Sequence, residues 1–195
     1  MSTYDFRVPP LVVIGGGAFQ RAGVEAKRLG AKRALLVTDE NLLHLSHVGM
    51  VQCELQDQGL SVVVYPEVNS EPTVEHIENG LALLRQEECD IVVSVGGGSP
   101  IDTGKAIALM ATNDGSIKDY IGMDKFKNPK LPLIAIPTTA GTGSEVTRFI
   151  IVTDTATNVK MIIGSPLAIS DVALVDYNLT VTMPASVTAS TGLDA

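Results

Sequence analysis

The chain has 195 residues, 45% hydrophobic and 18% charged, and this balance excludes an intrinsically disordered protein. Its net charge of −8 argues against nucleic-acid binding, because that class of protein draws its affinity from basic surfaces. No apolar run is long enough to cross a membrane, and the N-terminus lacks the pattern of a signal peptide. Cys53 and Cys89 lack the spacing of a metal site, so we expect reduced thiols in a soluble, cytoplasmic protein.

The first 112 residues alternate short apolar runs with segments of helical periodicity. Such alternation predicts parallel strands joined by right-handed crossovers, and unbroken apolar strands indicate helices on both faces of the sheet. The expected fold is therefore α/β, with a mostly parallel, Rossmann-like sheet flanked by helices. Strands are expected at 11–14, 33–38, 60–65 and 91–95, and helices at 19–29, up to about 58, from 73 and at 99–112.

After Gly115 the pattern changes to short strand candidates separated by turns, at 133–136, 149–153, 159–163 and 172–175. Residues 154–158 are typical of a hairpin loop, so a β-hairpin region is expected towards the C-terminus. A further helix is expected to begin at Pro184, since proline suits the first helical turn. The sequence stops at Ala195 within that pattern, which we interpret as a truncated chain. The expected domains are 1–183 and the beginning of a second one, 184–195.

Two glycine triplets are candidate phosphate-binding turns. Gly15-Gly16-Gly17 follows the first strand, and Asp39 follows the second strand 24 residues after Gly15, near the place where a dinucleotide-binding fold carries a ribose-binding acid. Gly96-Gly97-Gly98 follows the fourth strand. Neither triplet has the third small residue of that fingerprint. Each triplet is equally compatible with a tight turn, and Asp39 with a helix N-cap.

The second triplet is followed by residues typical of a helix start. Ser99 is expected to cap the helix and donate to a phosphate, with Pro100 at the first helical position and Asp102 in the first turn. Asp102 is therefore also a candidate cofactor-binding residue. Lys105, one turn later, is interpreted as solvated or paired with a carboxylate. The spacing does not match a phosphate-hydrolysing P-loop.

A third candidate segment, residues 136–145, is rich in hydroxyl groups and glycine and directly follows a strand. Open α/β sheets bind ligands at the carboxyl ends of their strands, so this loop is a candidate binding loop. The alternative is that its threonines cap the next turn. His44 and His47 have a spacing close to that of metal ligands on a helix but no obvious third partner, so we expect both on a solvated helix face.

Together these segments resemble the iron-containing (group III) alcohol dehydrogenases. The resemblance covers essentially the whole chain. It implies an N-terminal dinucleotide-binding domain followed by an all-helical, metal-binding domain, and an oligomeric enzyme. The motifs that carry it are Val37-Thr38-Asp39, Gly96 to Asp102, 133–145, Thr147-Arg148-Phe149 and 188–195.

The resemblance implies that Gly96, Gly97, Gly98 and Ser99 meet the pyrophosphate of NAD, while Gly15 to Gly17 form an early turn. Asp39 would bind the adenosine ribose and repel a 2′-phosphate, which favours NAD over NADP.

Thr138, Thr139 and Thr142 would line the cofactor near its phosphates and nicotinamide ribose. Lys160 falls at the position of a cofactor-contacting lysine, and Phe149 would wall the substrate pocket beside the nicotinamide. Glu71 stands where such proteins often carry Asn, so the adenosine contact expected there is in doubt.

Asp194 matches the family's first metal ligand, for Fe²⁺ or Zn²⁺, and the family's other ligands are histidines that this sequence lacks. One carboxylate does not hold a catalytic ion, which needs about three protein ligands. In the complete enzymes the metal polarises the alcohol oxygen. The resemblance thus implies the cofactor half of an NAD-dependent dehydrogenase of a small primary alcohol, diol or aldehyde, inactive by itself.

Two alternatives differ from that interpretation. One is a stand-alone dinucleotide-binding module, or an assembly fragment, without redox activity. The other is a relative of glycerol dehydrogenase or dehydroquinate synthase, against which the motif from Thr138 to Glu145 and the context of Asp194 argue.

Overall fold

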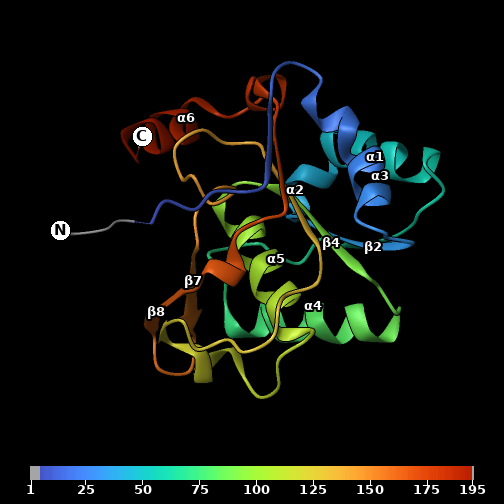
Figure 1. The fold of residues 1–195 in the computed structure, drawn as a ribbon. Helices are drawn as coiled ribbons and strands as arrows, with labels where there is room; N and C mark the ends of the chain where they lie inside the picture. The colour runs from blue at the N-terminus through green and yellow to red at the C-terminus, as the bar shows by residue number, and fades with distance from the viewer. Residues whose placement is uncertain (1–4, 195) are drawn as a thin grey trace.

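A computed structural model describes residues 5–194, and the side chain of Asp194 lies outside the described part. Two sheets contact the same helix, α5 (Gly98–Met110), and the larger one carries helices on both faces (Figure 1).

The larger sheet has six strands, all paired in parallel, in the order β1-β9-β6-β4-β2-β3. The α/β fold class and the parallel pairing are therefore confirmed. Its strands are β1 (Leu11–Ile14), β2 (Arg33–Val37), β3 (Ser61–Tyr65), β4 (Ile91–Gly96), β6 (Leu133–Pro137) and β9 (Val172–Val175). β6 and β9 belong to this sheet although the sequence pattern grouped them with the hairpin region, because each is an apolar run short enough to suit either sheet.

Two apolar cores form on opposite faces of this sheet, because successive strand residues point to opposite sides. In β2, Leu36 packs with α1 (Ala22–Arg28) and α3 (Ser46–Asp57), whereas Leu35 packs with α4 (Val74–Gln86) and α5. Figure 1 shows α1 and α3 above the sheet and α4 and α5 below it. The helix expected at 19–29 begins as a 3₁₀ turn, η1 (Ala18–Arg21), and the helical stretch up to 58 is divided into α2 (Glu40–Leu43) and α3.

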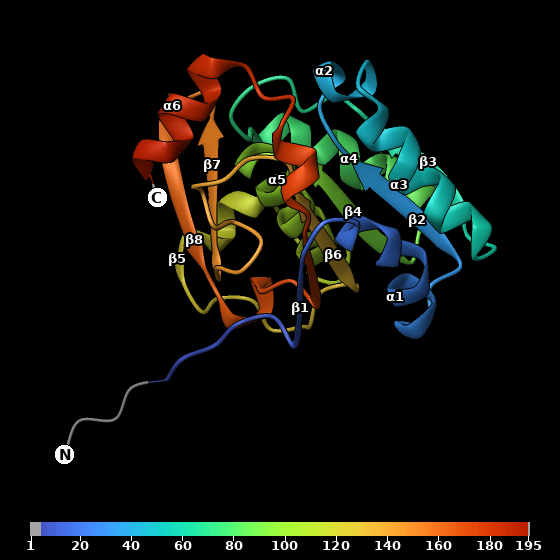
Figure 2. The same ribbon diagram turned by 90° about the horizontal axis from the view of Figure 1, so that it is seen from above.

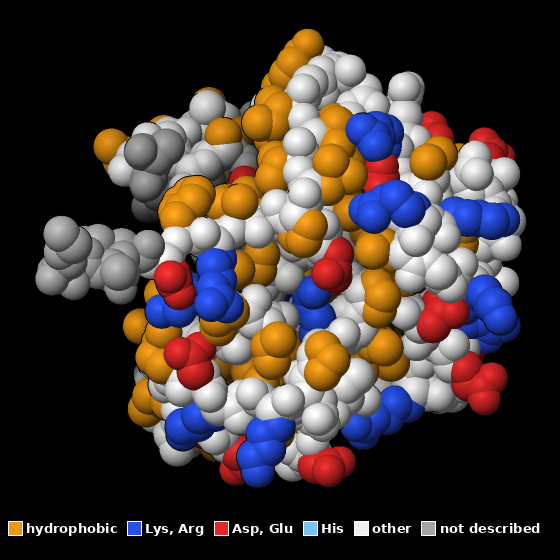
Figure 3. Space-filling view, in the orientation of Figure 1, with side chains coloured by type: hydrophobic (Ala, Val, Ile, Leu, Met, Phe, Trp, Pro, Cys, Tyr) orange, Lys and Arg blue, Asp and Glu red, His pale blue; other side chains and the backbone are white. Residues whose placement is uncertain are grey.

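The smaller sheet has the order β5-β8-β7. β7 (Phe149–Asp154) and β8 (Val159–Gly164) form the expected antiparallel hairpin, and β5 (Gly122–Met123), too short to leave a sequence pattern, pairs in parallel with β8. Ile150 and Val152 face the core beside α5, while Phe149 and Ile151 are exposed. Figure 3 shows such surface hydrophobic side chains interspersed with charged ones on one face of the molecule.

The remaining elements are η2 (Ile117–Tyr120), η3 (Pro166–Ala168), η4 (Tyr177–Thr180) and α6 (Ala185–Asp194), which begins next to Pro184 as predicted. Figure 2 shows α6 and β7 overlapping in that view, whereas Figure 1 shows α6 well above β7. None of the helices within residues 5–194 has the length and apolar character needed to cross a membrane. Both cysteines are free thiols, Cys89 buried and Cys53 exposed.

Candidate functional site

A cavity of about 570 Å³ lies where the parallel strands end. Its walls come from the segments that follow β2, β3, β4 and β6, and from the stretch between η4 and α6. Ligands of open α/β sheets bind at this edge. The lining residues are Asp39, Asn41, Leu42, Leu45, Val68, Asn69, Ser70, Gly97, Gly98, Ser99, Pro100, Thr138, Thr139, Leu179, Thr182, Met183, Pro184 and Val187.

Two residues of the second glycine triplet, Gly97 and Gly98, line this cavity, and none of the first triplet does. Gly15 instead forms a turn beside the end of β9, with its N–H donating to the Val175 carbonyl at 3.0 Å. At the second triplet, a Cβ on Gly97 would lie 3.3 Å from the Thr139 side chain, and one on Gly98 would lie 3.2 Å from that of Thr142. The loop after β6 therefore packs closely onto the turn because the turn is made of glycine.

The helix after the turn begins one residue earlier than the sequence pattern predicts. Gly97 is the N-cap of α5, in an extended conformation, and no side chain in the described part of the chain caps the helix. The predictions that Ser99 is the cap and Pro100 the first helical residue are wrong, since Pro100 is the third residue of α5 and Asp102 the fifth. An uncapped first turn leaves the positive end of the helix dipole facing the cavity.

Thr139 carries the clearest sign of a missing polar partner in the cavity wall. Its Oγ1 atom is buried without a hydrogen-bond partner among the described residues. A buried hydroxyl without a partner costs on the order of 1–3 kcal/mol, so a ligand atom that bonds to it is favoured. Thr138 is also buried, and its N–H donates to the Gly96 carbonyl at 2.9 Å.

Asp39 is a helix N-cap, as one interpretation of its position held, while its contact with a ribose stays a prediction. It is the N-cap of α2, accepting a hydrogen bond from the Leu42 N–H at 3.0 Å, and it lines the cavity. No ion pair within residues 5–194 includes Asp39. Its carboxylate therefore gives that end of the cavity negative charge.

Several predicted site residues lie outside the cavity lining: Gly96, Asp102, Thr142, Phe149 and Lys160. Thr142 contacts Gly98 and accepts from the Ser144 N–H, so it lies behind the turn. The Lys160 ammonium is 2.7 Å from the Glu71 carboxylate, and both side chains are exposed. Glu71 thus engages the lysine expected to contact a cofactor. Phe149 is 42% exposed, with the Arg148 guanidinium 5.5 Å from its ring centroid.

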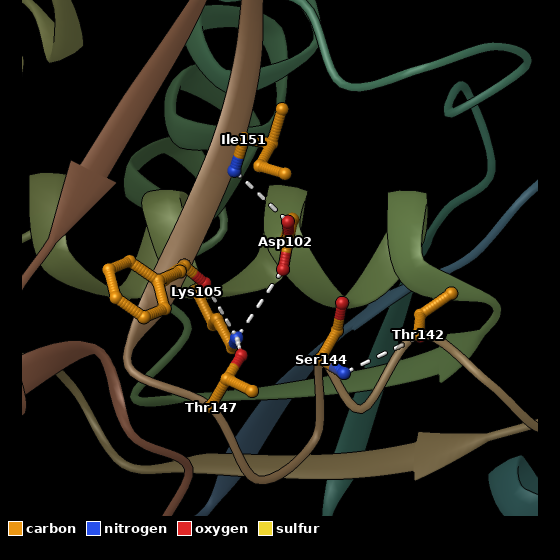
Figure 4. Close-up of polar contacts among 7 residues, drawn as sticks. Asp102, Lys105, Thr142, Ser144, Thr147 and Ile151 are labelled. Atoms are coloured by element: carbon orange, nitrogen blue, oxygen red, sulfur yellow. Dashed lines mark hydrogen bonds and ion pairs between the residues drawn. The ribbon is translucent and has the colours of Figure 1, made fainter. Parts of the chain in front are cut away.

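Asp102 and Lys105 form a buried ion pair at 3.3 Å (Figure 4). The Lys105 ammonium also donates to the Phe149 carbonyl at 2.9 Å, and the Asp102 carboxylate accepts from the Ile151 N–H at 3.0 Å. Burial raises the pKa of Asp102 above its usual value and lowers that of Lys105, while each partner opposes the shift of the other. Lys105 is paired with a carboxylate, as one of the two expectations held, and it is fully buried.

The prediction of a solvated His47 is wrong. His47 lies in α3 and is buried, with its Nε2 2.9 Å from the hydroxyl oxygen of Thr182, because the segment after η4 covers it. His44 is exposed as expected. Across the described side chains, no three His, Cys, Asp or Glu residues gather to hold a metal ion. The expected metal ligand, the Asp194 side chain, lies outside the described part.

Much of the cavity wall was not predicted from the sequence. Asn41 and Asn69 each lie four residues after the end of a strand, so polar residues in the segments that follow the strands are a signal for them. The apolar wall formed by Leu179, Met183 and Val187 leaves no such signal, because it comes from a distant part of the chain.

The model of the iron-containing alcohol dehydrogenase family matches residues 9–177 of this chain. The chain belongs to that family. The NAD-dependent methanol dehydrogenase of Bacillus methanolicus is 42% identical over 98% of this chain and 50% of its own length. For the 1,3-propanediol dehydrogenase of Citrobacter freundii the identity is 41%, over the same shares of the two chains.

Solved structures show the same similarity. The crystal structure of a 1,3-propanediol oxidoreductase matches with a TM-score of 0.97 and 40% identity, over 99% of this chain and 50% of that one. The sulfoacetaldehyde reductase of Bifidobacterium kashiwanohense, solved in complex with NAD⁺, matches with a TM-score of 0.91 and 33% identity, over 100% of this chain and 51% of its own. The chain thus spans about half the length of these relatives.

Proposed function

We propose that this chain binds NAD in the cavity at the carboxyl edge of its parallel sheet, as the cofactor half of an alcohol dehydrogenase. The observation that carries the proposal is the unpartnered Thr139 hydroxyl beside the uncapped N-terminus of α5. A hydroxyl donor and exposed helix N–H groups fit a pyrophosphate, which brings acceptors and negative charge. Gly97 and Gly98 line the cavity, and Ser99 adds a hydroxyl at the same wall.

In this proposal the parts of the chain hold different parts of the cofactor. The turn from Gly96 to Ser99, with Thr138 and Thr139, binds the pyrophosphate, and Asp39 accepts hydrogen bonds from the adenosine ribose. Thr142 and Phe149 belong to the nicotinamide end, and Lys160 is a further residue that contacts the cofactor. Bound NAD supplies the hydride acceptor. The protein's contribution is to orient the cofactor and to keep water from the ring.

Metal activation and the substrate, a small primary alcohol, diol or aldehyde, are also part of the proposal. Asp194 would be one ligand of Fe²⁺ or Zn²⁺. Because the described residues hold no further ligand set, we expect no alcohol oxidation by these 195 residues alone. In this scheme residues 1–183 form the NAD-binding domain, 184–195 begin a helical one, and the complete enzyme is a cytoplasmic homo-oligomer.

Calorimetric titration with NADH tests the cofactor assignment. We expect saturable binding, and no binding to the folded chain at millimolar NADH would reject the proposal. A second titration with NADPH should give much weaker binding, because the Asp39 carboxylate repels a 2′-phosphate.

Replacing Asp39 separates its charge from its capping role. Asn caps a helix as well as Asp does, so Asp39→Asn keeps α2 while removing the charge, and Asp39→Gly removes both at a capping cost of a few tenths of a kcal/mol. Both variants should bind NADPH relatively better than the wild type does. An unchanged ratio of NADH to NADPH affinity would show that Asp39 does not lie at the adenosine ribose.

The alternative function is a stand-alone dinucleotide-binding module. It shares the NADH-binding prediction and differs in the effect of adding a helical domain from a relative. Alcohol-dependent NADH formation on such addition supports the dehydrogenase, whereas binding that never leads to turnover supports the module.

A further inference from the structure

We propose that Asp102 and Lys105 are positioning residues that fix the backbone of residues 147–151 relative to the phosphate-binding turn. They would thereby set the nicotinamide end of the site without touching the cofactor. The inference deepens the proposed NAD binding and rests on it for its second readout. It gives Asp102 a role different from the cofactor contact expected from sequence.

The contacts of Lys105 carry the argument. An ammonium group has three donors and no acceptor. The Lys105 ammonium has three acceptors within hydrogen-bond distance: Asp102 Oδ1 at 3.3 Å, the Thr147 hydroxyl at 3.4 Å and the Phe149 carbonyl at 2.9 Å. Two of these three acceptors lie on the segment that enters the hairpin. The side chain is 0% exposed, so water does not substitute for a lost partner.

Asp102 completes the attachment from the same face of α5, one turn before Lys105. Its Oδ2 accepts from the Ile151 N–H at 3.0 Å, two residues beyond the carbonyl that Lys105 binds. Figure 4 shows Asp102 between Ile151 and the Lys105 ammonium, with Thr147 below them. One carboxylate and one ammonium therefore hold a donor and two acceptors of residues 147–151, which fixes the register of that strand along α5.

Apolar packing alone would not fix this register. Ile150 and Val152 bury the inner face of β7, but contacts between apolar side chains are non-directional. A buried ion pair adds little net stability compared with apolar residues of the same volume, and its best-attested use is to specify one arrangement. We therefore expect the ion pair to fix the position of residues 147–151 and to change the free energy of unfolding little.

The position of the pair on α5 connects it to the cofactor site. α5 begins at Gly98, which contacts Thr142 and Ser144 of the same loop, and Asp102 lies one turn further. One rigid helix therefore carries both the phosphate-binding turn and the attachment of Phe149. In this proposal the helix sets the distance between the protein groups that bind the pyrophosphate and those beside the nicotinamide.

The test variant is the double replacement Asp102→Asn with Lys105→Met. Asn retains an acceptor for the Ile151 N–H, and removing both charges leaves neither one buried alone, so the variant is expected to fold. The matched control is Lys130→Met, which breaks a Lys–Asp pair (2.7 Å to Asp171) away from the cavity. Should the double variant not fold, Thr147→Val, which removes one of the three acceptors, replaces it.

Two readouts separate this inference from the proposed function. Hydrogen exchange without cofactor should show residues 144–151 exchanging at least tenfold faster in the test variant than in Lys130→Met, and equal rates overturn the inference. In calorimetry the ratio of NADH to ADP-ribose affinity should fall severalfold while ADP-ribose affinity is retained. An unchanged ratio, or an equal loss for both ligands, also overturns it. A wild-type chain that binds neither ligand rejects the proposed function, and hydrogen exchange then still decides the attachment.

Discussion

The six-stranded and the three-stranded sheet both pack on α5, but different interactions hold them there. The larger sheet buries its two central strands completely, since every residue of β4 and β6 is buried. The smaller sheet buries one face, and it is tied to the rest of the chain by Lys105, which is buried, and by Lys118 and Lys160, which are partly exposed. The larger sheet thus obtains its stability from apolar area, while the smaller one obtains its position from a few directional bonds.

The largest predicted effect is on the core of the larger sheet. Leu36 lies in β2 and is 0% exposed, so Leu36→Ala should lower the free energy of unfolding by about 2–5 kcal/mol, measured by urea denaturation. The matched control is Ile151→Ala on the outer face of β7, where the side chain is 44% exposed. There the loss should stay below about 1 kcal/mol. Similar losses for the two variants would contradict the comparison.

The second predicted effect is on the stability of α6, which contacts the loop after β6 at Gly141. Gly141 has a φ of +139°, and a Cβ there would lie 1.9 Å from the Thr191 carbonyl oxygen. Gly141→Ala should therefore displace α6 and cost about 1–3 kcal/mol, seen as faster hydrogen exchange in residues 185–194.

Gly192→Ala is the control for Gly141→Ala. Nothing lies within 4 Å of a Cβ at Gly192 in α6, so this change should slow the exchange of α6, since alanine favours the helix by about 1 kcal/mol over glycine. Equal exchange of α6 in the two variants would show that the close approach at Gly141 does not hold the helix.

The sequence places four of the six strands of the larger sheet correctly, because these are apolar runs of the right length between helices, and it groups β6 and β9 with the hairpin region. Ile91 to Val95 shows this, since a short run rich in β-branched residues before a glycine turn is typical of a buried strand. The site is predicted in part: Asp39, Gly97 and Thr139 follow strands, and strand ends meet at one edge. The pairing of Asp102 with the Ile151 N–H leaves no such pattern, because its partners are 49 residues apart and one of them is a backbone atom.

A smaller effect is expected on the stability of the β7–β8 hairpin at low pH. The hydrogen bond from Lys118, 2.9 Å away, holds the pKa of Asp154 below its usual 3.8, against the opposing effect of burial and with help from Thr157 and Ala156. A carboxyl whose pKa is lower in the folded state stabilises it above the unfolded pKa. That contribution is lost as pH falls through the folded value.

Hydrogen exchange of residues 149–164, corrected for intrinsic rates, should therefore rise in the wild type as pH falls below about 4. Asp154→Asn has no carboxyl to titrate, so its exchange in this region should change less over the same range. Parallel profiles for the two proteins would show that Asp154 does not anchor the hairpin.

The smallest effect is expected at the ion pair of Glu71 with Lys160, which also joins the two regions. Its 2.7 Å distance is shorter than that of Asp102 with Lys105, yet its side chains are 62% and 60% exposed. Solvent screens such a pair, so Glu71→Gln should change the free energy of unfolding by less than about 1 kcal/mol, and by less still at high salt. A larger loss that persists at high salt would mean that distance, and not burial, decides which ion pairs hold the hairpin in place.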